Sequence, residues 1–341
     1  MVTANKALIA VHGNEIFRAA HEKGVIVAFE AAVAGGIPVI KSLREGLGAN
    51  RIEWVAGIIN GTGNFILTHM RDEGRAFEDV LAEAQALGYA EADPTFDVEG
   101  IDAAHKLTIL ASIAYGVPLQ FEKAFTEGIS RITAEDVEQA DNLGYVIKHL
   151  GISKRTDQGL ELRVHPTLIP KERLLANVHG VKNAIAVMGD AVGPTLYYGA
   201  GAGAEPTASA VVADLLDVAR DIATDHHYRV PYLAFSGIDE DVSQLPIMPM
   251  EEITTAYYLR LLAVDRPGVL ARVATILAEQ GISIEALIQK EATEGELVPI
   301  ILLTHRTKEK QMNEAIREIE AMADIAGPVT RIRVESLDEG E

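Results

Sequence analysis

The chain has 341 residues, 48% of them hydrophobic, so it can bury a sizeable core spread over two or three domains. Its formal net charge of −20 at pH 7 argues against a nucleic-acid partner, because the phosphates would be repelled. It contains no cysteine, which excludes disulfides, thiolate nucleophiles and cysteine metal sites and is typical of a reducing cytosol. We therefore expect a cytoplasmic protein.

No membrane-directing segment is visible in the sequence. Residues 1–10 are too short and wrongly flanked for a signal peptide. The most apolar window, VIVAFEAAVAGGIPVI, is interrupted by Glu30 and is shorter than the roughly 20 residues that a membrane span needs. We expect no membrane partner.

The first 29 residues read as a loop, a helix and a strand, with the strand in VIVAFEA (25–31). One helix and one strand cannot cover both faces of a parallel sheet. Either these residues attach to the next domain, or further chain normally precedes Met1.

The following segment, 30–205, predicts an α/β domain with a mixed sheet. FEDVLAEAQALG predicts a helix that stops at Gly88, and Thr133 with Asp136 forms a helix-start box. Strands alternating with helices and turns are typical of this class of domain. A helix at 206–223 follows, which we expect to pack back on residues 1–29. The strand-like runs of the segment are 51–59, 160–169, 184–189 and 195–199.

The last third of the chain predicts a separate unit at 254–341, joined by a linker at 224–253 that includes LPIMPMEE with its two prolines. YYLRLLAV reads as a strand and PGVLARVATILAEQG as a helix. Two strands, an amphipathic helix and a last strand, VTRIRVES, follow. The order β-α-β-β-α-β is ferredoxin-like: a four-stranded sheet with both helices on one face.

The acid-rich stretch AEADPTFDVEGIDAAHKL is the strongest candidate for chemistry. Asp102 and Lys106 are four residues apart, so they share one face of a helix that begins near Asp102. A stabilising surface ion pair is the ordinary interpretation. The residues after Lys106 are nearly all apolar, however, so we expect partial burial, which lowers the pKa of a lysine as proton transfer requires. Glu91, Asp93 and Asp97 precede the helix on a loop, where they could hold a substrate ammonium group.

Three further segments each remain open to two interpretations. Lys6 is either a solvated lysine at a helix start or a functional group. Gly35, in FEAAVAGGIP, belongs to a simple turn or to a hard-cation site made of carbonyl oxygens. Gly61 and Thr62, in GIINGTGNFI, belong to a hairpin or to a loop around a ligand.

A fourth segment, YGAGAGAEPT, approximates the dinucleotide-binding fingerprint through Gly199, Gly201 and Ala204. The match is weak, because the preceding strand is short and no complete βαβ unit follows. A loop with Gly201 and Gly203 that leads into a helix N-terminus remains a fair contact for an anion or a phosphate.

Taken together, these motifs resemble the homoserine dehydrogenase family, in order through almost the whole chain. The resemblance implies NAD- or NADP-dependent interconversion of L-aspartate 4-semialdehyde and L-homoserine, in threonine and methionine biosynthesis. The last unit, with VDRPGVLARVATILAEQGISIEAL, is similar to an ACT domain, an amino-acid-sensing module. The family motifs are VTANKAL, FEAAVAGGIP, NGTGNFIL, GYAEADPTFDVEGIDAAHKL and GAGAGAEPTASAVVADL.

The resemblance also implies roles for individual residues. Lys106 is similar to the proton donor to the carbonyl oxygen, with Asp102 beside it, and Lys6 matches a lysine near cofactor and substrate. Glu91 is similar to the carboxylate that grips the substrate amino group, and Asp97 lies in the same region. The glycine-containing motifs add Gly61 and Thr62 for the substrate and Gly201 and Gly203 for the cofactor.

Further sites are implied by the same resemblance. A sodium site, formed mostly by carbonyl oxygens, maps to Glu30, Val33, Gly35 and Ile37. The loop DRPGVL would bind an effector, threonine by the same resemblance, through Asp265, Pro267 and Gly268. The alternative is that the ACT unit serves only for dimerisation. We expect a homodimer or a higher homo-oligomer.

The family begins with a strand, a G-x-G-x-x-G turn and a helix, which form most of its nucleotide-binding domain. This chain starts inside that domain, so residues 1–29 would be its remnant, and a preference for NAD or NADP cannot be read. We therefore expect a homoserine dehydrogenase without its amino-terminal segment, through a shortened expression product or a mis-assigned start codon, and with an incomplete cofactor site. One alternative is a catalytically deficient fragment that acts as an amino-acid-sensing ACT module. Another is an ACT-bearing dehydrogenase for a hydroxy acid, which would lack the segment from Glu91 to Lys106.

Overall fold

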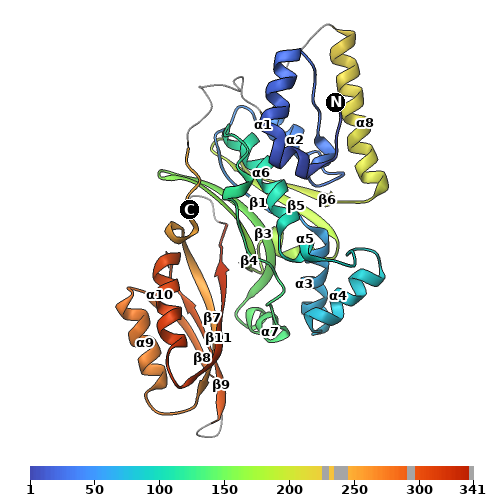
Figure 1. Ribbon diagram of the computed structural model, residues 1–341. Helices are drawn as coiled ribbons and strands as arrows, with labels where there is room; N and C mark the ends of the chain where they lie inside the picture. The colour runs from blue at the N-terminus through green and yellow to red at the C-terminus, as the bar shows by residue number, and fades with distance from the viewer. Residues whose placement is uncertain (225–229, 234–244, 290–295, 338–341) are drawn as a thin grey trace.

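The structure is a computed structural model that describes residues 1–224, 230–233, 245–289 and 296–337. Within these residues, one mixed sheet of eleven strands runs through the molecule (Figure 1). The strand order is β6-β5-β1-β3-β4-β11-β7-β9-β8, while β2 pairs with β4 and β10 with β7. Much of the linker predicted at 224–253 and the last four residues of the chain lie outside the described residues.

The larger part of the molecule, residues 1–224, carries one half of this sheet. β1 lies between β3 and β5 and is antiparallel to both, and β3 forms a long hairpin with β4. The strands of this half are β1 (Ile52–Ile58), β2 (Phe125–Thr126), β3 (Tyr145–Thr156), β4 (Gly159–Pro170), β5 (Lys182–Gly189) and β6 (Gly193–Ala200).

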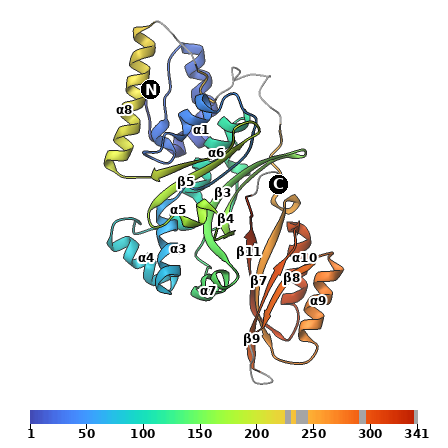
Figure 2. The same cartoon turned by 180° about the vertical axis from the view of Figure 1, so that it is seen from behind.

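The helices of the larger part gather mainly in two places (Figures 1 and 2). α1, α2 and α8 lie together at one end of the molecule, and α3, α4 and α5 lie beside the sheet. The helices are α1 (Lys6–Lys23), α2 (Val39–Lys41), α3 (Gly61–Glu73), α4 (Phe77–Ala86), α5 (Thr95–Val98), α6 (Ile101–Tyr115), α7 (Ala134–Asn142) and α8 (Ala204–Ala223). The short helical turns are η1 (Glu30–Ala32), η2 (Ser42–Gly46), η3 (Phe121–Lys123), η4 (Leu174–Asn177) and η5 (Met250–Glu252).

The central helix α6 is apolar on nearly all sides because it is enclosed by α1 and by strands β1, β3 and β4. It begins after Gly100, whose φ of 82° lies in the left-handed region that favours glycine, and it ends at Gly116. The start predicted near Asp102 is therefore confirmed. The helix-start box predicted at Thr133 and Asp136 is also present, at the beginning of α7.

Two strand predictions differ from the structure. The strand predicted in 25–31 is wrong: Ala28 forms only an isolated bridge with Val2, and η1 follows directly. No longer strand lies beside this segment in the described part of the chain, so its extended backbone has no ladder to join. Conversely, β3 was not expected, because the buried Lys148 and His149 break the apolar pattern that marks an interior strand.

The NGTG segment begins a helix instead of forming a hairpin. The Asn60 side-chain oxygen accepts a hydrogen bond of 2.7 Å from the main-chain N–H of Gly63, which caps the N-terminus of α3. The hairpin interpretation of this segment is therefore wrong. Asparagine is common both in turns and at helix N-caps, so the sequence alone did not separate the two.

The C-terminal part has the predicted β-α-β-β-α-β order, and α9 and α10 lie on the same side of its sheet in both views (Figures 1 and 2). Helix α9 begins after Gly268 (φ 93°), so Pro267 precedes the helix instead of standing in its first turn. The elements are β7 (Thr254–Val264), α9 (Val269–Glu279), β8 (Ile284–Gln289), β9 (Leu297–Thr304), β10 (Thr307–Lys308), α10 (Glu309–Glu320) and β11 (Ile325–Val334).

The two halves of the sheet are continuous. β11 pairs in parallel with β4, with Arg333 opposite Thr167 and Val334 opposite Leu168. The fold is therefore the mixed α/β fold predicted from the sequence, but the ferredoxin-like sheet extends the larger sheet instead of standing apart.

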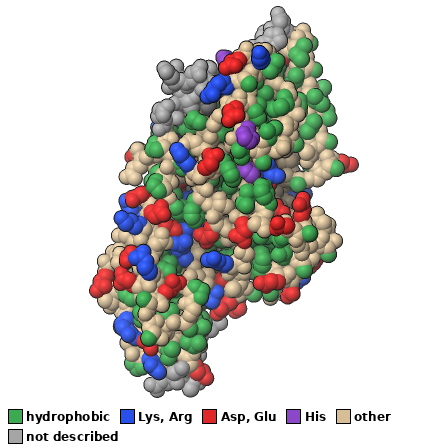
Figure 3. Space-filling view, in the orientation of Figure 1, with side chains coloured by type: hydrophobic (Ala, Val, Ile, Leu, Met, Phe, Trp, Pro, Cys, Tyr) green, Lys and Arg blue, Asp and Glu red, His purple; other side chains and the backbone are tan. Residues whose placement is uncertain are grey.

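The helix predicted at 206–223 is present as α8. Its apolar side chains Val212, Leu215, Leu216 and Ile222 are exposed, and Figure 3 shows hydrophobic groups along this edge of the molecule. On its other side, the Asp214 carboxylate accepts a hydrogen bond of 2.9 Å from the N–H of Glu30. None of the helices in the described part of the chain is long and apolar enough to cross a membrane.

Candidate active site

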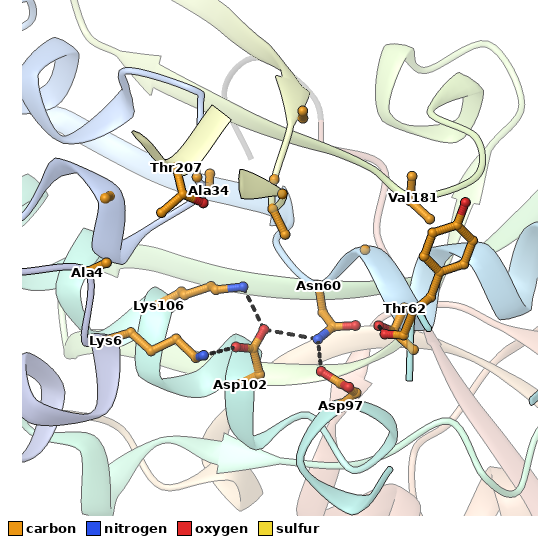
Figure 4. Close-up of a pocket in the computed structure, with 18 of the residues that line it drawn as sticks. Ala4, Lys6, Ala34, Asn60, Thr62, Asp97, Asp102, Lys106, Val181 and Thr207 are labelled. Atoms are coloured by element: carbon orange, nitrogen blue, oxygen red, sulfur yellow. Dashed lines mark hydrogen bonds and ion pairs between the residues drawn. The ribbon is translucent and has the colours of Figure 1, made fainter. Parts of the chain in front are cut away.

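A cavity with a volume of about 570 Å³ lies within the larger part. It lies where the starts of α1, α3, α6 and α8 converge, together with α5 and the glycine-rich loop at 200–203. Lys6 reaches it from α1, Asp97 from α5, and Asp102 and Lys106 from α6 (Figure 4). Segments more than a hundred residues apart in sequence therefore build one site.

Asp102 is the centre of the charged groups in this cavity. Its Oδ2 lies 2.6 Å from the Nζ of Lys106, and its Oδ1 lies 3.0 Å from the Nζ of Lys6 (Figure 4). Burial alone would raise the pKa of Asp102, but the two lysines and the Asn60 amide outweigh it and lower the pKa to about 2. Asp102 is therefore a carboxylate at neutral pH.

The Lys106 side chain is only 12% exposed, so the partial burial expected from the sequence is confirmed. Besides its ion pair with Asp102, its ammonium group donates a hydrogen bond of 2.8 Å to the carbonyl oxygen of Ile59. Two acceptors thus hold the nitrogen at the wall of the cavity.

Asn60 belongs to this cluster, although sequence reasoning did not single it out. Its Nδ2 donates hydrogen bonds to Asp97 Oδ1 at 2.8 Å and to Asp102 Oδ2 at 2.9 Å. The only signal in the sequence was an asparagine directly after an apolar strand. That pattern predicts a cap or a turn and says nothing about distant carboxylates.

Some acidic residues of the loop line the cavity, and another stabilises the loop itself. Asp97 and Glu91 line the cavity, with Glu91 exposed at the surface. Burial raises the pKa of Asp97, and the hydrogen bond from Asn60 opposes this shift. The carboxylate of Asp93 instead accepts bonds from the N–H and hydroxyl of Thr95 at the start of α5.

The glycine-containing segments close the cavity from the other side. Gly61 and Thr62 line it at the start of α3, and Gly201 and Gly203 line it before α8. β6, which leads into the second loop, is antiparallel to β5, so the glycine pattern from residue 199 does not belong to a βαβ nucleotide-binding unit. The α8 N-terminus still presents main-chain N–H groups to an anion.

Asn183 supplies an unusual polar group next to the glycine loops. The residue is 1% exposed, and neither Oδ1 nor Nδ2 has a hydrogen-bond partner among the described residues. A Cβ at Gly201 would lie 2.0 Å from its Oδ1, so the loop passes this amide more closely than a residue with a Cβ could without a shift. Sequence reasoning did not select Asn183.

The residues of the predicted sodium site cluster at η1 and the turn after it. Both carboxylate oxygens of Glu30 accept main-chain hydrogen bonds, from Ile40 at 2.9 Å and Lys41 at 2.8 Å. Burial raises the pKa of Glu30 to about 7, despite these two hydrogen bonds. The carboxylate therefore caps α2, which leaves the carbonyl oxygens of Val33, Gly35 and Ile37 as possible cation ligands.

The residues of the predicted effector loop lie between β7 and α9. The N–H of Asp265 donates a hydrogen bond of 2.8 Å to Glu296, and Gly268 caps α9 after Pro267. The residues of this loop belong to the C-terminal part, whereas the cavity around Asp102 is lined entirely by residues of the larger part.

The cavity can bind a small zwitterion and exchange a proton with it. Carboxylates at its rim suit an ammonium group, helix N-termini suit a carboxylate, and a buried lysine stands beside an ionised aspartate. The fold and the site together define an α/β enzyme with an attached ferredoxin-like unit.

Comparisons with known proteins agree with this class. Residues 38–216 match the family model of homoserine dehydrogenase, and residues 257–324 match that of the ACT domain. A homoserine dehydrogenase of Pseudomonas aeruginosa is 70% identical over 339 residues, which are 99% of this chain and 78% of that protein.

Solved structures give the same result. The crystal structure of a homoserine dehydrogenase from Thiobacillus denitrificans matches with a TM-score of 0.94 and 67% identity, over 99% of this chain and 76% of that one. A hyperthermophilic archaeal homoserine dehydrogenase in complex with NADPH matches with a TM-score of 0.56 and 30% identity, over 64% of each chain. The chain belongs to the homoserine dehydrogenase family, oxidoreductases of amino-acid biosynthesis, and carries a C-terminal ACT domain.

Proposed function

We propose that this chain interconverts L-aspartate 4-semialdehyde and L-homoserine with NAD or NADP, and that Lys106 exchanges the proton of the substrate oxygen. The observation that carries the proposal is the position of Lys106: its ammonium group is largely buried, lies 2.6 Å from Asp102, and lines the same cavity as Asp97 and Glu91. A general acid must reach the reacting oxygen inside a site that also fixes the substrate.

The charges of the cavity define how the substrate lies. The substrate's ammonium group is held by Asp97 and Glu91, and its carboxylate lies against the N-terminus of α3, at Gly61 and Thr62. The remaining end of the molecule, which carries the aldehyde or alcohol oxygen, then reaches Lys106.

The chain's own residues manage the proton. When bound, the reduced cofactor supplies a hydride to the aldehyde carbon. Lys106 Nζ gives a proton to the oxygen as its charge develops, and in the reverse direction it receives that proton from the alcohol. Asp102 stays ionised because two lysines share it, so it orients Lys106 without taking up the proton at neutral pH.

Substitution of Lys106 tests this role. Measured at saturating cofactor, so that an incomplete cofactor site does not limit turnover, Lys106→Ala should lower kcat about 10²- to 10⁴-fold. Lys106→Arg should also be slow, because a guanidinium keeps the charge but does not release a proton near neutral pH. The control is Lys123→Ala, an exposed lysine hydrogen-bonded to Gln120. A Lys106→Ala enzyme with the turnover of Lys123→Ala would show that Lys106 is structural.

The residues toward the cofactor are Lys6, Gly201 and Gly203. The fit is partial: the α8 N-terminus can meet a phosphate, and the unpartnered amide of Asn183 lies under the same loop. Next to α1, by contrast, the described residues form no parallel sheet. Their parallel pairing there is limited to one isolated bridge, between Val2 and Ala28. We propose an incomplete cofactor site, tested by titrating the 341-residue chain with NADH and NADPH. Binding of either cofactor with a micromolar Kd would contradict the proposal of an incomplete cofactor site.

The sodium site stays a proposal that rests on main-chain carbonyls. The described residues contain no group of three acidic or histidine side chains suited to a metal ion. We propose that sodium is held by Val33, Gly35 and Ile37 without the carboxylate of Glu30. Thermal unfolding in sodium and in potassium chloride at equal ionic strength tests it, and equal Tm values would count against the site.

For the ACT domain we propose threonine as an effector, bound at Asp265, Pro267 and Gly268. Support comes from the loop itself, where a glycine with positive φ lets the main chain turn closely into α9.

We also propose a homodimer or higher oligomer, because β8 is an edge strand of the sheet. Calorimetry with threonine and analytical ultracentrifugation test the two proposals, and a monomer without heat of binding would contradict both.

The alternative function is an amino-acid-binding module without turnover. Such a module would bind threonine in the ACT domain, and no reaction would take place in the cavity around Asp102. The convergence of Lys6, Asp102 and Lys106 in one cavity favours the enzyme, since a binding module has no need of a buried proton donor. Threonine binding by a chain that neither binds homoserine nor turns it over would favour the module.

A further inference from the structure

We infer that Asn60 is a positioning residue of this site: its amide joins the substrate-binding carboxylate Asp97 to the catalytic pair Asp102–Lys106. The inference rests on the proposed function, because it assigns Asn60 a part in that reaction. No contact of Asn60 with the substrate is implied.

The first observation is that one NH₂ group serves two carboxylates. Asn60 Nδ2 lies 2.8 Å from Asp97 Oδ1 and 2.9 Å from Asp102 Oδ2, so both of its hydrogens are used. Two carboxylates that approach the same nitrogen would otherwise repel each other. A neutral amide is suited to this position because it donates twice without adding a charge that would compete with Lys106.

The second observation is the unequal charge around the two carboxylates. Asp102 has two lysines, Lys6 and Lys106, within 3.0 Å. Asp97 is half-buried and accepts the hydrogen bond from Asn60, which favours its ionised form. Asn60 therefore keeps Asp97 available for an ammonium group. Asn60 also fixes the position of Asp102 Oδ2, which is the same oxygen that accepts the hydrogen bond from Lys106 Nζ.

The third observation is that Asn60 is itself fixed. It is 6% exposed, and its Oδ1 accepts the N–H of Gly63 at 2.7 Å. The preceding carbonyl, of Ile59, accepts the hydrogen bond from Lys106 Nζ. A Cβ at Gly61 would lie 2.7 Å from the carbonyl oxygen of Val181, so this stretch of backbone is tightly confined. The junction of β1 and α3 thus fixes three charged groups through one rigid segment.

Two variants separate the helix cap from the bridging role. Asn60→Ser keeps a good N-cap oxygen but is too short to reach both carboxylates. Asn60→Asp keeps the shape and the cap and replaces the two donors with a third negative charge. The matched control is Asn50→Ser, because within the described part of the chain the Asn50 amide bonds to main-chain groups of Leu47 and Val192, outside the cavity.

The experiment titrates the aspartate carboxyls by ¹³C NMR and measures homoserine binding by calorimetry, with the full chain. In Asn60→Ser the pKa of Asp97 should rise, because the carboxylate loses a hydrogen bond that favours its ionised form, and homoserine affinity should fall. The affinity loss should grow as the pH falls toward the pKa of Asp97 and shrink again as the pH rises. Asn60→Asp should show larger changes of both, and Asn50→Ser none. Tm should stay within a few degrees for Asn60→Ser.

An unchanged Asp97 titration and unchanged homoserine affinity in Asn60→Ser would overturn the inference and leave Asn60 as a helix cap alone. If the wild-type chain itself fails to bind homoserine, the proposed function fails. The Asp97 titration still decides the bridging role in that case, because it needs neither substrate nor turnover.

Discussion

At the scale of single residues, burial has different consequences for two lysines of this protein. Lys106 is paired with Asp102, whereas among the described residues Lys148, in β3, donates to the neutral oxygens Asn64 Oδ1, at 3.1 Å, and the carbonyl of Val178. Lys148 is 2% exposed, and burial lowers its pKa to about 8. The charge of Lys106 is therefore balanced by an anion, whereas Lys148 is held by neutral oxygens and costs stability when charged.

We predict that Lys148 makes the protein more stable in alkaline solution. Between pH 8 and 10.5, the value for an unperturbed lysine, the unfolded chain holds a proton that the folded chain has released, so stability rises with pH. Relative to Lys148→Met, the unfolding free energy of the wild type should rise by about 3 kcal/mol across this range. Urea unfolding at several pH values measures it. Lys310→Met, at an exposed position, should show no such trend.

The two aspartates of the acidic loop form a matched pair for a second prediction. Asp97→Asn should raise KM for homoserine about 10- to 100-fold, because it removes a charge-assisted contact with the ammonium group. Asp93→Asn should leave KM unchanged, since Asp93 bonds to Thr95. Wild-type KM should increase as pH falls and Asp97 becomes protonated, and the Asp97→Asn value should stay flat. Equal KM values for the two variants would remove Asp97 from the substrate site.

At the scale of elements, function depends on where helices begin. α1, α3, α6 and α8 all start at the cavity, so their N-termini and first-turn side chains meet there. α8 can start where it does because the loop at 200–203 passes closely over Asn183 and the 33–37 turn. A Cβ at Gly35 would lie 2.5 Å from the carbonyl oxygen of Gly201, so the two loops are in direct contact.

This close approach predicts that Gly201→Ala is harmful. The added Cβ would lie 2.0 Å from Asn183 Oδ1, and relief requires a shift of this buried side chain or of the loop, at a cost of about 1–3 kcal/mol. Cofactor binding should weaken with it. Gly46→Ala is the control, because a Cβ there meets nothing within 4 Å and the backbone is helical. Thermal unfolding of both variants measures the difference, and equal Tm values would contradict the close packing.

At the scale of the whole molecule, the ACT domain is joined to the larger part by a sheet and by buried charges. Arg333 of β11 is fully buried and binds Glu309 of α10 and Glu127 of the larger part. Arg163 of β4 binds Glu335, just after β11, at 2.7 Å. Because Glu127 lies three residues before Ser130, which binds Glu99 beside α6, this contact links the ACT domain to the helix of the catalytic pair.

We predict that the buried ion pair between Arg333 and Glu309 contributes strongly to the stability of the protein. Glu309→Gln leaves the buried guanidinium of Arg333 without its nearest negative charge and should destabilise the protein by about 3 kcal/mol. Glu252→Gln should change stability by less than about 1 kcal/mol, because its ion pair with Lys308 is exposed. Urea unfolding measures both, and similar midpoints would show that the buried network adds nothing.

The sequence by itself determined the local features of this protein. Apolar periodicity and turn residues predicted the ACT-like unit, α4 and α6, and the spacing of Asp102 and Lys106 predicted their pairing. These predictions succeed because they depend on neighbours within a few residues along the chain.

Only the tertiary structure decided what depends on distant neighbours. It gave the segment at 25–31 no strand to pair with, placed β3 in the sheet despite Lys148, and joined β4 to β11. It also showed that Asn60, for which the sequence left a hairpin open, donates hydrogen bonds to Asp97 and Asp102. Sheet pairing and buried charge are set by groups far away in sequence, so no local pattern records them.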